Sequence, residues 1–356
     1  MLMKRSSFFS FALFFSLCFA VALRAQTDLN LPDASQKAAV QQRVGITDIA
    51  VSYNRPVVNG RKVWGGLVPL GEVWRAGANQ NTTIEFSTPV QVEGKPLPAG
   101  KYGLHMIPTA DQWTIIFSKM ALAWGSYTYS ETEDALRVTV KPRENAMEEA
   151  LEFEFEDLKP DSTTVLMKWE KLAVPFRVAV SDAETVLPSI RTQLRGRDKW
   201  QWQSQMEAAQ YALTKKINLE EALTWADQSI QLEERFENLS VKADLLKAMN
   251  KAEEAKKVSE RALEISTPVQ LYSYARQLMS QNRGVEAMEI LPVVAKRAPQ
   301  TVFGLLSQAR IKSAAGDFAG AAEAAKQAQA VAVSDQQKQN IKALIDRLQA
   351  KQDINK

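Results

Sequence analysis

The chain has 356 residues, of which 46% are hydrophobic and 24% are charged, and its formal net charge is +3. This composition is that of a folded protein of two or three domains, and it excludes a disordered or collagen-like chain. The net charge arises within residues 1–25, which hold three basic side chains and no acidic one. The balanced remainder gives no electrostatic reason to bind nucleic acid or an anionic membrane surface.

The N-terminus has the pattern of a secretory signal peptide. Lys4 and Arg5 precede an apolar run, residues 8–23, and small residues follow. We expect cleavage after Ala25, with cleavage after Ala22 as the alternative. A membrane anchor needs about twenty consecutive apolar residues, and this run is shorter and interrupted by polar ones. The sequence therefore predicts an exported protein that is soluble in the periplasm or outside the cell after removal of residues 1–25.

Cysteine and histidine are scarce in this chain. The single cysteine, Cys18, lies within the predicted signal peptide, and the single histidine is His105. The mature chain would therefore have no disulfide, no thiolate nucleophile and no cysteine-based metal site, and one histidine cannot form a paired-histidine zinc motif. A Ser-His triad would have to use His105 as its base. We expect neither a metal ion nor a cofactor.

Residues 37–180 show the two-residue alternation of β-strands. Leu151, Phe153 and Phe155, for example, alternate with glutamates. Turn signals such as Asn59-Gly60 separate the segments, and no helical pattern interrupts them. We therefore predict an antiparallel β-sandwich or jelly-roll-like domain over residues 26–180. The expected strands are ITDIAVSY (46–53), TTIEF (82–86), WTIIFS (113–118), LRVTV (136–140), LEFEFEDL (151–158) and a closing hairpin of TTVLMKWE (163–170) and LAVPFRVAV (172–180).

After residue 180 the hydrophobic period becomes that of a helix. We expect a helical linker over residues 181–200 and helical repeats over residues 201–350. A self-similar element recurs in the repeats with spacings of 33, 32 and 34 residues, close to the tetratricopeptide period. The aromatic consensus positions are mostly absent, so the repeats are degenerate, and the alternative is a plain helical bundle. The aligned alanines that define the spacing are Ala222, Ala255, Ala287 and Ala321.

Five motifs follow one another in a specific order in the first half. They are ASQKAAV from Ala34, VSYNRPVVNGRKVWGGLVPLGEVWRAGAN from Val51, GKPLPAGKYGLHMIP from Gly94, WTIIFSK from Trp113 and AWGSYTYSETEDALRVTVKP from Ala123. Over about residues 28–180 the chain thereby resembles the bacterial exported family called domain of unknown function 2911. The resemblance implies an exported β-domain and no activity, and the tetratricopeptide tail is similar to what other members carry. Family members often carry an acid where this chain has Gln80, and glutamine cannot take a proton near neutrality.

The segment VWRAGANQNTTIEF, residues 73–86, displays polar and aromatic side chains before a strand. Guanidinium groups bind carboxylates and flat rings cover sugar faces, so a small polar, anionic or carbohydrate-like ligand would suit this loop. We expect Arg75 and Asn79 to orient that ligand. In the structural alternative, Arg75 stacks on a neighbouring tryptophan while Trp64 and Trp74 plug the end of the sandwich. The candidate ligand-binding residues are Arg55, Arg61, Trp74, Arg75, Asn79, Gln80, His105 and Trp124.

Two functions fit these patterns. The first is an exported, non-catalytic binding and scaffold protein whose helical repeats bind a peptide or an envelope protein on their concave face, unless they only buttress the β-domain. The second is a carbohydrate-active or other hydrolytic enzyme that uses carboxylates such as Glu72 and Glu85, supported by Arg75 and His105. Ser126 lies outside any GxSxG elbow, which argues against a serine hydrolase. We favour binding over catalysis.

Overall fold

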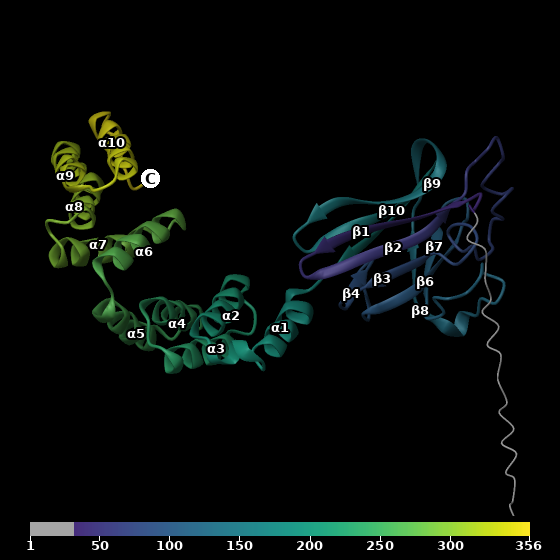
Figure 1. Cartoon of the computed structure of the whole chain (residues 1–356), viewed down its shortest axis with the longest axis horizontal. Helices are drawn as coiled ribbons and strands as arrows, with labels where there is room; N and C mark the ends of the chain where they lie inside the picture. Colours follow the sequence, from purple (N-terminus) through teal and green to yellow (C-terminus); the bar gives the residue numbers. More distant parts are fainter. Residues whose placement is uncertain (1–31) are drawn as a thin grey trace, which may run out of the picture.

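The computed structural model describes residues 32–356 (Figure 1). Within them, a β-domain with strands β1 to β10 is followed by a helical region with helices α1 to α10. The predicted signal peptide and its cleavage site lie outside the described residues. In the described part, no α-helix combines the length and apolar character needed to cross a membrane.

The first sheet of the β-domain has six antiparallel strands in the order β1-β2-β3-β6-β7-β8. Alternation places Ile49, Val51 and Tyr53 of β2 in the core, with at most 4% exposure. β1, an edge strand that the sequence pattern did not predict, pairs with β2 along its whole length. The six strands are β1 (Gln36–Val44), β2 (Thr47–Arg55), β3 (Thr83–Phe86), β6 (Gly100–Ile107), β7 (Trp113–Ser118) and β8 (Asp134–Val140).

The second sheet has four strands in the order β5-β4-β10-β9. These are β4 (Val90–Val92), β5 (Lys95–Leu97), β9 (Arg143–Lys159) and β10 (Ser162–Ala179). The prediction of a closing hairpin within residues 163–180 was wrong, because both segments belong to the single strand β10. A bulge at Glu170, whose φ is 55°, shifts the register against β9. The extra residue shifts the alternation of inward-facing and outward-facing side chains by one position. In the sequence, this break in the alternation looks like a turn between two strands.

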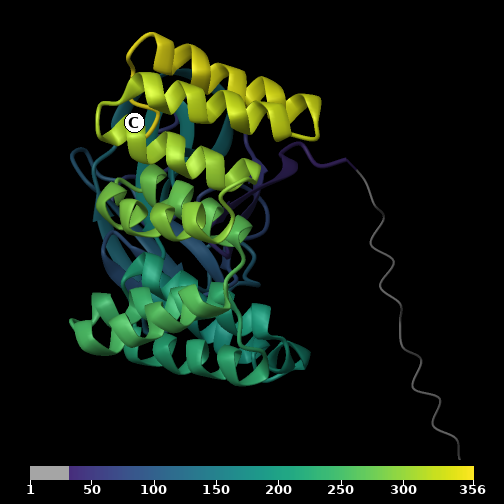
Figure 2. The ribbon, with the colours of Figure 1, turned by 90° about the vertical axis from the view of Figure 1, so that its left-hand side faces the viewer.

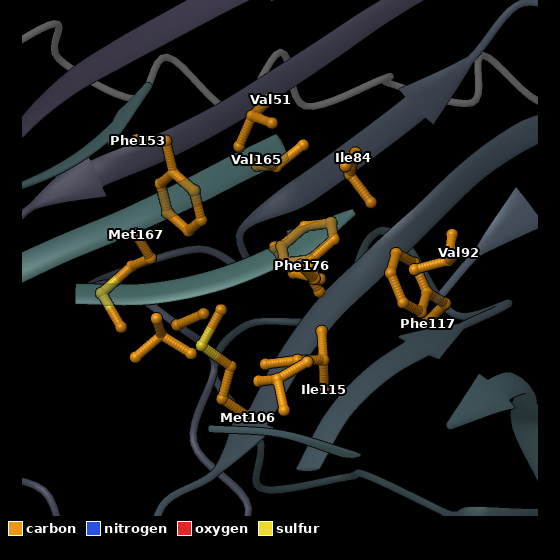
Figure 3. Close-up of a cluster of buried hydrophobic side chains, with 14 of the residues drawn as sticks. Val51, Ile84, Val92, Met106, Ile115, Phe117, Phe153, Val165, Met167 and Phe176 are labelled. Carbon is orange, nitrogen blue, oxygen red and sulfur yellow. The ribbon is translucent and has the colours of Figure 1, made fainter. Parts of the chain in front are cut away.

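The two sheets enclose one apolar core between them (Figure 3). Val51, Ile84 and Phe117 from the first sheet face Phe153 and Phe176 from the second, and each is at most 2% exposed. The rings of Phe117 and Phe176 meet edge to face across the sheets, with their centroids 5.8 Å apart. The β-domain is therefore the antiparallel sandwich that the alternation predicted.

The helical region is built from successive helix pairs, α2 with α3, α4 with α5, α6 with α7 and α8 with α9, and α10 packs on α9. Figure 2 shows the stacked helices with α10 at the far end of the stack. The helices are α1 (Asp182–Gln193), α2 (Trp202–Lys215), α3 (Leu219–Leu232), α4 (Phe236–Ala248), α5 (Ala252–Ile265), α6 (Pro268–Ser280), α7 (Gly284–Arg297), α8 (Val302–Ala314), α9 (Phe318–Val331) and α10 (Asp335–Gln349).

The aligned alanines occupy the same place in every second helix. Ala222, Ala255, Ala287 and Ala321 are each the fourth residue of α3, α5, α7 and α9, and each is at most 1% exposed. A small side chain at this position lets the two helices of a pair approach closely. This recurrence confirms the predicted helical repeats, in which each unit contributes one helix pair.

Helix α1, in the segment expected to be a linker, packs on the helices that follow it. Its buried Leu187 shares a cluster with Ala209 and Ala222 of the first helix pair. Arg191 forms a two-pronged ion pair with Glu221, with both N–O distances at 2.7 Å. The hydrophobic contacts of α1 therefore belong to the helical region rather than to the sandwich.

Candidate functional site

Residues 73–82 run along the edge of β6, and a second segment covers the outward-facing side chain of His105 in the same strand. The backbone of Trp74 exchanges two hydrogen bonds of 2.8 Å with Met106 in β6. Residues 119–130, here called the cover loop, join the segment at Asn81, whose backbone N–H donates to the carbonyl of Ala123 at 3.0 Å. Glycine is required at position 77, because a Cβ there would lie 2.7 Å from the Thr82 hydroxyl and 3.1 Å from the carbonyl oxygen of Asn54 in β2. The segment is thus a fixed part of the domain.

Trp74 turns its ring toward the aromatic core. Its ring stacks on Trp169 with centroids 5.8 Å apart and meets Trp64 edge to face at 5.7 Å. The indole N–H donates to the carbonyl of Gly77 at 3.2 Å. This placement matches the structural alternative for Trp64 and Trp74, in which both rings fill the end of the sandwich.

The three arginines of the predicted site contact three different segments. Arg55 donates to the carbonyl of Leu151 at 2.9 Å and to Glu152 at 3.4 Å, so it ties β2 to β9. Arg61 donates to the carbonyl of Val58 at 3.0 Å, within its own turn. The guanidinium groups of Arg55 and Arg61 therefore bind nearby backbone carbonyls. Of the three predicted arginines, only Arg75 belongs to the loop of residues 73–86.

Arg75 lies beneath an aromatic platform on the cover loop. Its guanidinium carbon is 5.9 Å from the centre of the Trp124 ring, a cation–π arrangement. Trp124 stacks on Tyr127 with centroids 6.1 Å apart, and the two side chains are 62% and 79% exposed. The Nε of Arg75 is buried without a hydrogen-bond partner, and the side chain forms no ion pair with the described residues. Gly125, with φ of 74°, leaves the space that the guanidinium occupies.

Asn79 and Gln80 stand beside this platform with unequal exposure. Asn79 has a left-handed backbone, with φ of 56°, and a half-buried side chain. Gln80 is exposed, and its backbone bridges to that of Trp124. Neither side chain makes a hydrogen bond to another residue within 32–356, so both are available to a ligand at the surface.

His105 is buried beneath the cover loop, with 2% of its surface exposed. Its Nδ1 lies 2.9 Å from the hydroxyl of Ser126, and its Nε2 lies 3.3 Å from the amide nitrogen of Asn81. Burial disfavours the charged imidazolium and lowers the pKa of His105 to about 4, although the negative charge of Asp134 opposes this shift. His105 is therefore neutral at physiological pH.

The neighbours of His105 determine which ring nitrogen carries its proton. The amide nitrogen of Asn81 also faces the carbonyl of Met120 at 3.5 Å, so this end of the amide is the donor. Nε2 consequently accepts from Asn81, and the proton lies on Nδ1, which donates to Ser126. In this tautomer His105 cannot take the proton of Ser126, so the pair is not arranged as a nucleophile with its general base.

A groove runs along the helical region between α2, α4 and α6, with a volume of about 820 Å³. Apolar side chains form part of its wall, and amides and hydroxyls form much of the rest. The wall includes Met206, Leu213, Val269, Ser273, Gln277 and Gln281. This volume is within the range of ligand-binding clefts in proteins.

The charged side chains of this groove neutralise one another. Arg283 forms a two-pronged pair with Asp244, at 2.8 and 3.0 Å, and a second pair with Glu286. The hydrogen bond from Arg283 lowers the pKa of Glu286 to about 2, with Lys247 contributing. Burial raises the pKa of Tyr274 to about 12, so this phenol stays protonated. The groove therefore has no large excess of either charge.

Comparison with known proteins identifies the first half of the chain. Residues 35–178 match a family described as "Protein of unknown function (DUF2911)". The β-domain belongs to this family. No curated protein matches the chain. Among solved structures, the helical region resembles YrrB, whose crystal structure is described as that of a TPR protein with an unusual peptide-binding site. The two sequences are 16% identical and the TM-score of the match is 0.24. The match covers 48% of this chain and 93% of that chain.

One buried polar residue of the DUF2911 domain, which contacts His105, was absent from the candidates predicted from the sequence. Asn81 is 6% exposed and sits over Gly103, where a Cβ would lie 2.3 Å from its amide nitrogen. Its amide oxygen is buried without a partner. The three polar residues before TTIEF look alike in sequence, and only the fold of the cover loop over β6 buries one of them.

The carboxylates considered for glycoside hydrolysis are both at the surface of the DUF2911 domain. Glu72 and Glu85 are exposed, and Glu85 lies on the outer side of β3. No group of three or more His, Cys, Asp or Glu side chains is arranged to hold a metal ion within residues 32–356.

Proposed function

We propose that the protein is an exported binding and scaffold protein whose helical region holds an extended peptide segment of a partner. The groove between α2, α4 and α6 carries this proposal. The side chains of Gln277 in α6 and Gln281 just after it form no hydrogen bonds to the described residues, and amides can pair with the backbone of an extended peptide. Met206, Leu213 and Val269 offer apolar contacts for its side chains.

The test is selection of a displayed random dodecapeptide library on the full chain, followed by affinity measurements with the enriched peptides. Ser273→Trp places a large ring in the groove and should weaken binding at least about tenfold. Ser280→Trp, on the same helix but outside the groove, is the matched control and should bind normally. Equal affinity of both variants, or no enriched peptide, would exclude the groove as a peptide site.

A second binding function, at the DUF2911 domain, is favoured by the arrangement of Arg75 and Trp124. A guanidinium without a carboxylate partner, next to an exposed ring that stacks on a second exposed ring, suits a small anionic or carbohydrate-like ligand, with Gln80 beside it. This function needs no proton transfer, because neither arginine nor asparagine titrates at physiological pH. It is therefore a binding function in our proposal, with hydrolysis as the alternative.

Titration with glucuronate and glucose, followed by tryptophan fluorescence, tests the second function. Arg75→Ala should abolish the response to glucuronate while leaving the domain folded. Arg61→Ala, which removes a guanidinium that contacts only its own turn, should respond like the parent protein. Unfolding of the domain by Arg75→Ala would show that Arg75 is a structural clamp, and a response retained in this variant would place the ligand elsewhere.

Export is part of the proposal and rests on the pattern of residues 1–25. Fractionation of expressing cells should recover the processed chain with the periplasmic or extracellular proteins, and mass spectrometry should place its new N-terminus at Gln26. Recovery of the unprocessed chain in the cytoplasm would contradict export.

The proposal also includes the division of the chain into domains. In it, the β-domain ends at residue 180, a helical linker covers residues 181–200 and the repeats cover residues 201–350.

A further inference from the structure

A second pocket in the helical region lies between α6, α8 and α10 and has a volume of about 650 Å³. It borders a different face of α6 from the peptide groove, because Tyr272 and Arg276 line this pocket whereas Ser273 and Gln277 line the groove. In Figure 1, α6, α8 and α10 lie in the upper part of the helical arc. The two cavities can therefore be occupied independently.

Two arginines and no acidic side chain line this pocket, which we call the arginine pocket. Arg310 is 7% exposed and Arg276 is exposed. Within residues 32–356 neither forms an ion pair. Arg310 donates to four neutral acceptors: the hydroxyl of Tyr272 at 3.2 Å, the carbonyl of Ile354 at 2.7 Å, the side-chain oxygen of Asn355 at 3.3 Å and the sulfur of Met279 at 3.6 Å. Its charge is thus buried without a carboxylate.

This situation is unusual, because a buried charge is normally paired with an opposite one. The nearby tail does contain an acid, Asp353, but its carboxylate accepts from Ser313 and Asn355, both at 2.8 Å, instead of from Arg310. Arg283 in the groove shows the ordinary arrangement, with two carboxylates around one guanidinium. The arginine pocket therefore retains a positive potential that the peptide groove lacks.

Helix α10 adds hydrogen-bonding groups at the same place. Ser334 caps the helix by accepting from the backbone N–H of Gln337 at 3.2 Å, and both residues line the pocket together with Asn340. The N-terminal end of a helix carries a partial positive charge and attracts anions. Asp335 in this first turn offsets part of that charge but does not line the pocket. Phe303 and Leu344 supply an apolar wall beside the arginines.

We propose that the arginine pocket binds a carboxylate of an extended peptide, with Arg310 and Arg276 as its cationic contacts. Guanidinium groups hold carboxylates through charge-assisted hydrogen bonds, which are about twice as strong as neutral ones. The apolar wall accommodates the side chain that accompanies this carboxylate, which distinguishes a peptide from a free inorganic anion. The carboxylate belongs either to the C-terminus of the peptide or to an acidic side chain, and both have the same chemistry.

Fluorescence anisotropy with the full chain and three labelled peptides tests this inference. The peptides are Gly-Gly-Ala-Leu with a free C-terminus, the same peptide as its C-terminal amide, and the amide of Gly-Gly-Glu-Leu. A free C-terminus or a glutamate should strengthen binding at least about tenfold over the neutral amide, and the stronger of the two identifies the source of the carboxylate. The difference in affinity between the charged peptides and the neutral amide should decrease as salt is added. Equal binding of all three peptides, or displacement by equimolar inorganic phosphate, would overturn the proposal.

Matched variants separate the pocket from general attraction to a positive surface. Arg276→Met should reduce the affinity for the acidic peptide to that for the neutral amide, and its exposed side chain has no hydrogen bond within the described chain. Lys312→Met removes an exposed charge from α8 outside the pocket and should change nothing. An equal loss of affinity for the acidic peptide in both variants would contradict binding in the arginine pocket. Ser273→Trp, which blocks the peptide groove, should leave this binding unchanged, so failure of one site is distinguishable from failure of the other.

Discussion

The polar cluster around His105 in the DUF2911 domain and the peptide groove of the helical region differ in how far their polar side chains are exposed. In the first, Asn81 and His105 are 6% and 2% exposed beneath the cover loop. In the second, Gln277 and Gln281 stand on the open wall of a groove. A ligand reaches the helical groups directly, whereas it reaches His105 only if the cover loop moves. Binding to the DUF2911 domain is therefore expected at its surface platform, and its buried polar cluster is expected to stabilise the fold.

The cores of the two regions differ in the size of the side chains that meet in them. The sandwich packs large rings, including Trp113 and Trp169, each 1% exposed. The helix pairs meet instead at alanines such as Ala287 and Ala321, both 0% exposed. A core of large side chains is most sensitive to their removal, and a core of close helix contacts is most sensitive to enlargement. Opposite substitutions should thus damage one region and spare the other.

The largest expected effect is loss of a ring in the sandwich. Trp169→Ala removes a side chain that stacks on Trp74 and meets Trp64 at 5.6 Å, so it should destabilise the β-domain by about 3–5 kcal/mol. Urea unfolding followed by tryptophan fluorescence, with far-ultraviolet circular dichroism reporting on the helices, measures both regions. The helical transition should be unchanged. A shift of both transitions together would show that the two regions unfold as one unit.

The sequence predicted much of the fold because side-chain periods report directly on burial. Alternation located β7 at its observed bounds, and the spacing of Ala222 to Ala321 located every second helix of the repeats. The pattern failed where backbone geometry interrupts the period, as at Glu170, and where an edge strand has little apolar character, as in β1. Such features depend on the partner strand, which a local pattern does not contain.

The candidate site was less predictable for a related reason. Arg75 and Trp124 were expected to be neighbours of a ligand, and the fold brings them within cation–π distance of one another. Arg55 was expected nearby, yet it satisfies carbonyls of β9, a strand roughly a hundred residues away in sequence. Asn81 and the arginine pocket were not anticipated at all. Contacts between distant segments decide which polar side chains become buried, and these contacts follow from the assembled fold.

The second effect is pH-dependent and confined to the β-domain. His105 titrates near 6.5 when unfolded but near 4 when folded, so the unfolded state binds more protons between these values. The stabilisation is complete above pH 6.5 and is lost as the pH falls toward 4, by roughly 3 kcal/mol. Urea unfolding across this range should show the loss in the parent protein and not in His105→Gln. Because the chain has one histidine, its imidazole proton resonances report the folded pKa directly; a value near 6.5 would contradict the burial of His105.

The smallest of the three effects concerns the contacts between helices, where a small side chain is enlarged instead of a large one being removed. Ala321→Leu enlarges a side chain that is 0% exposed where α9 meets its neighbours, so overpacking should destabilise the helical region by about 1–3 kcal/mol. Ala319→Leu, on the exposed side of the same helix, adds the same atoms without a clash and is the matched control. Thermal unfolding followed by far-ultraviolet circular dichroism compares the two variants. If both lower the transition equally, helix propensity and not close packing governs the repeats; if only Ala321→Leu lowers it, the spacing of alanines in the sequence is a direct record of where the helices touch.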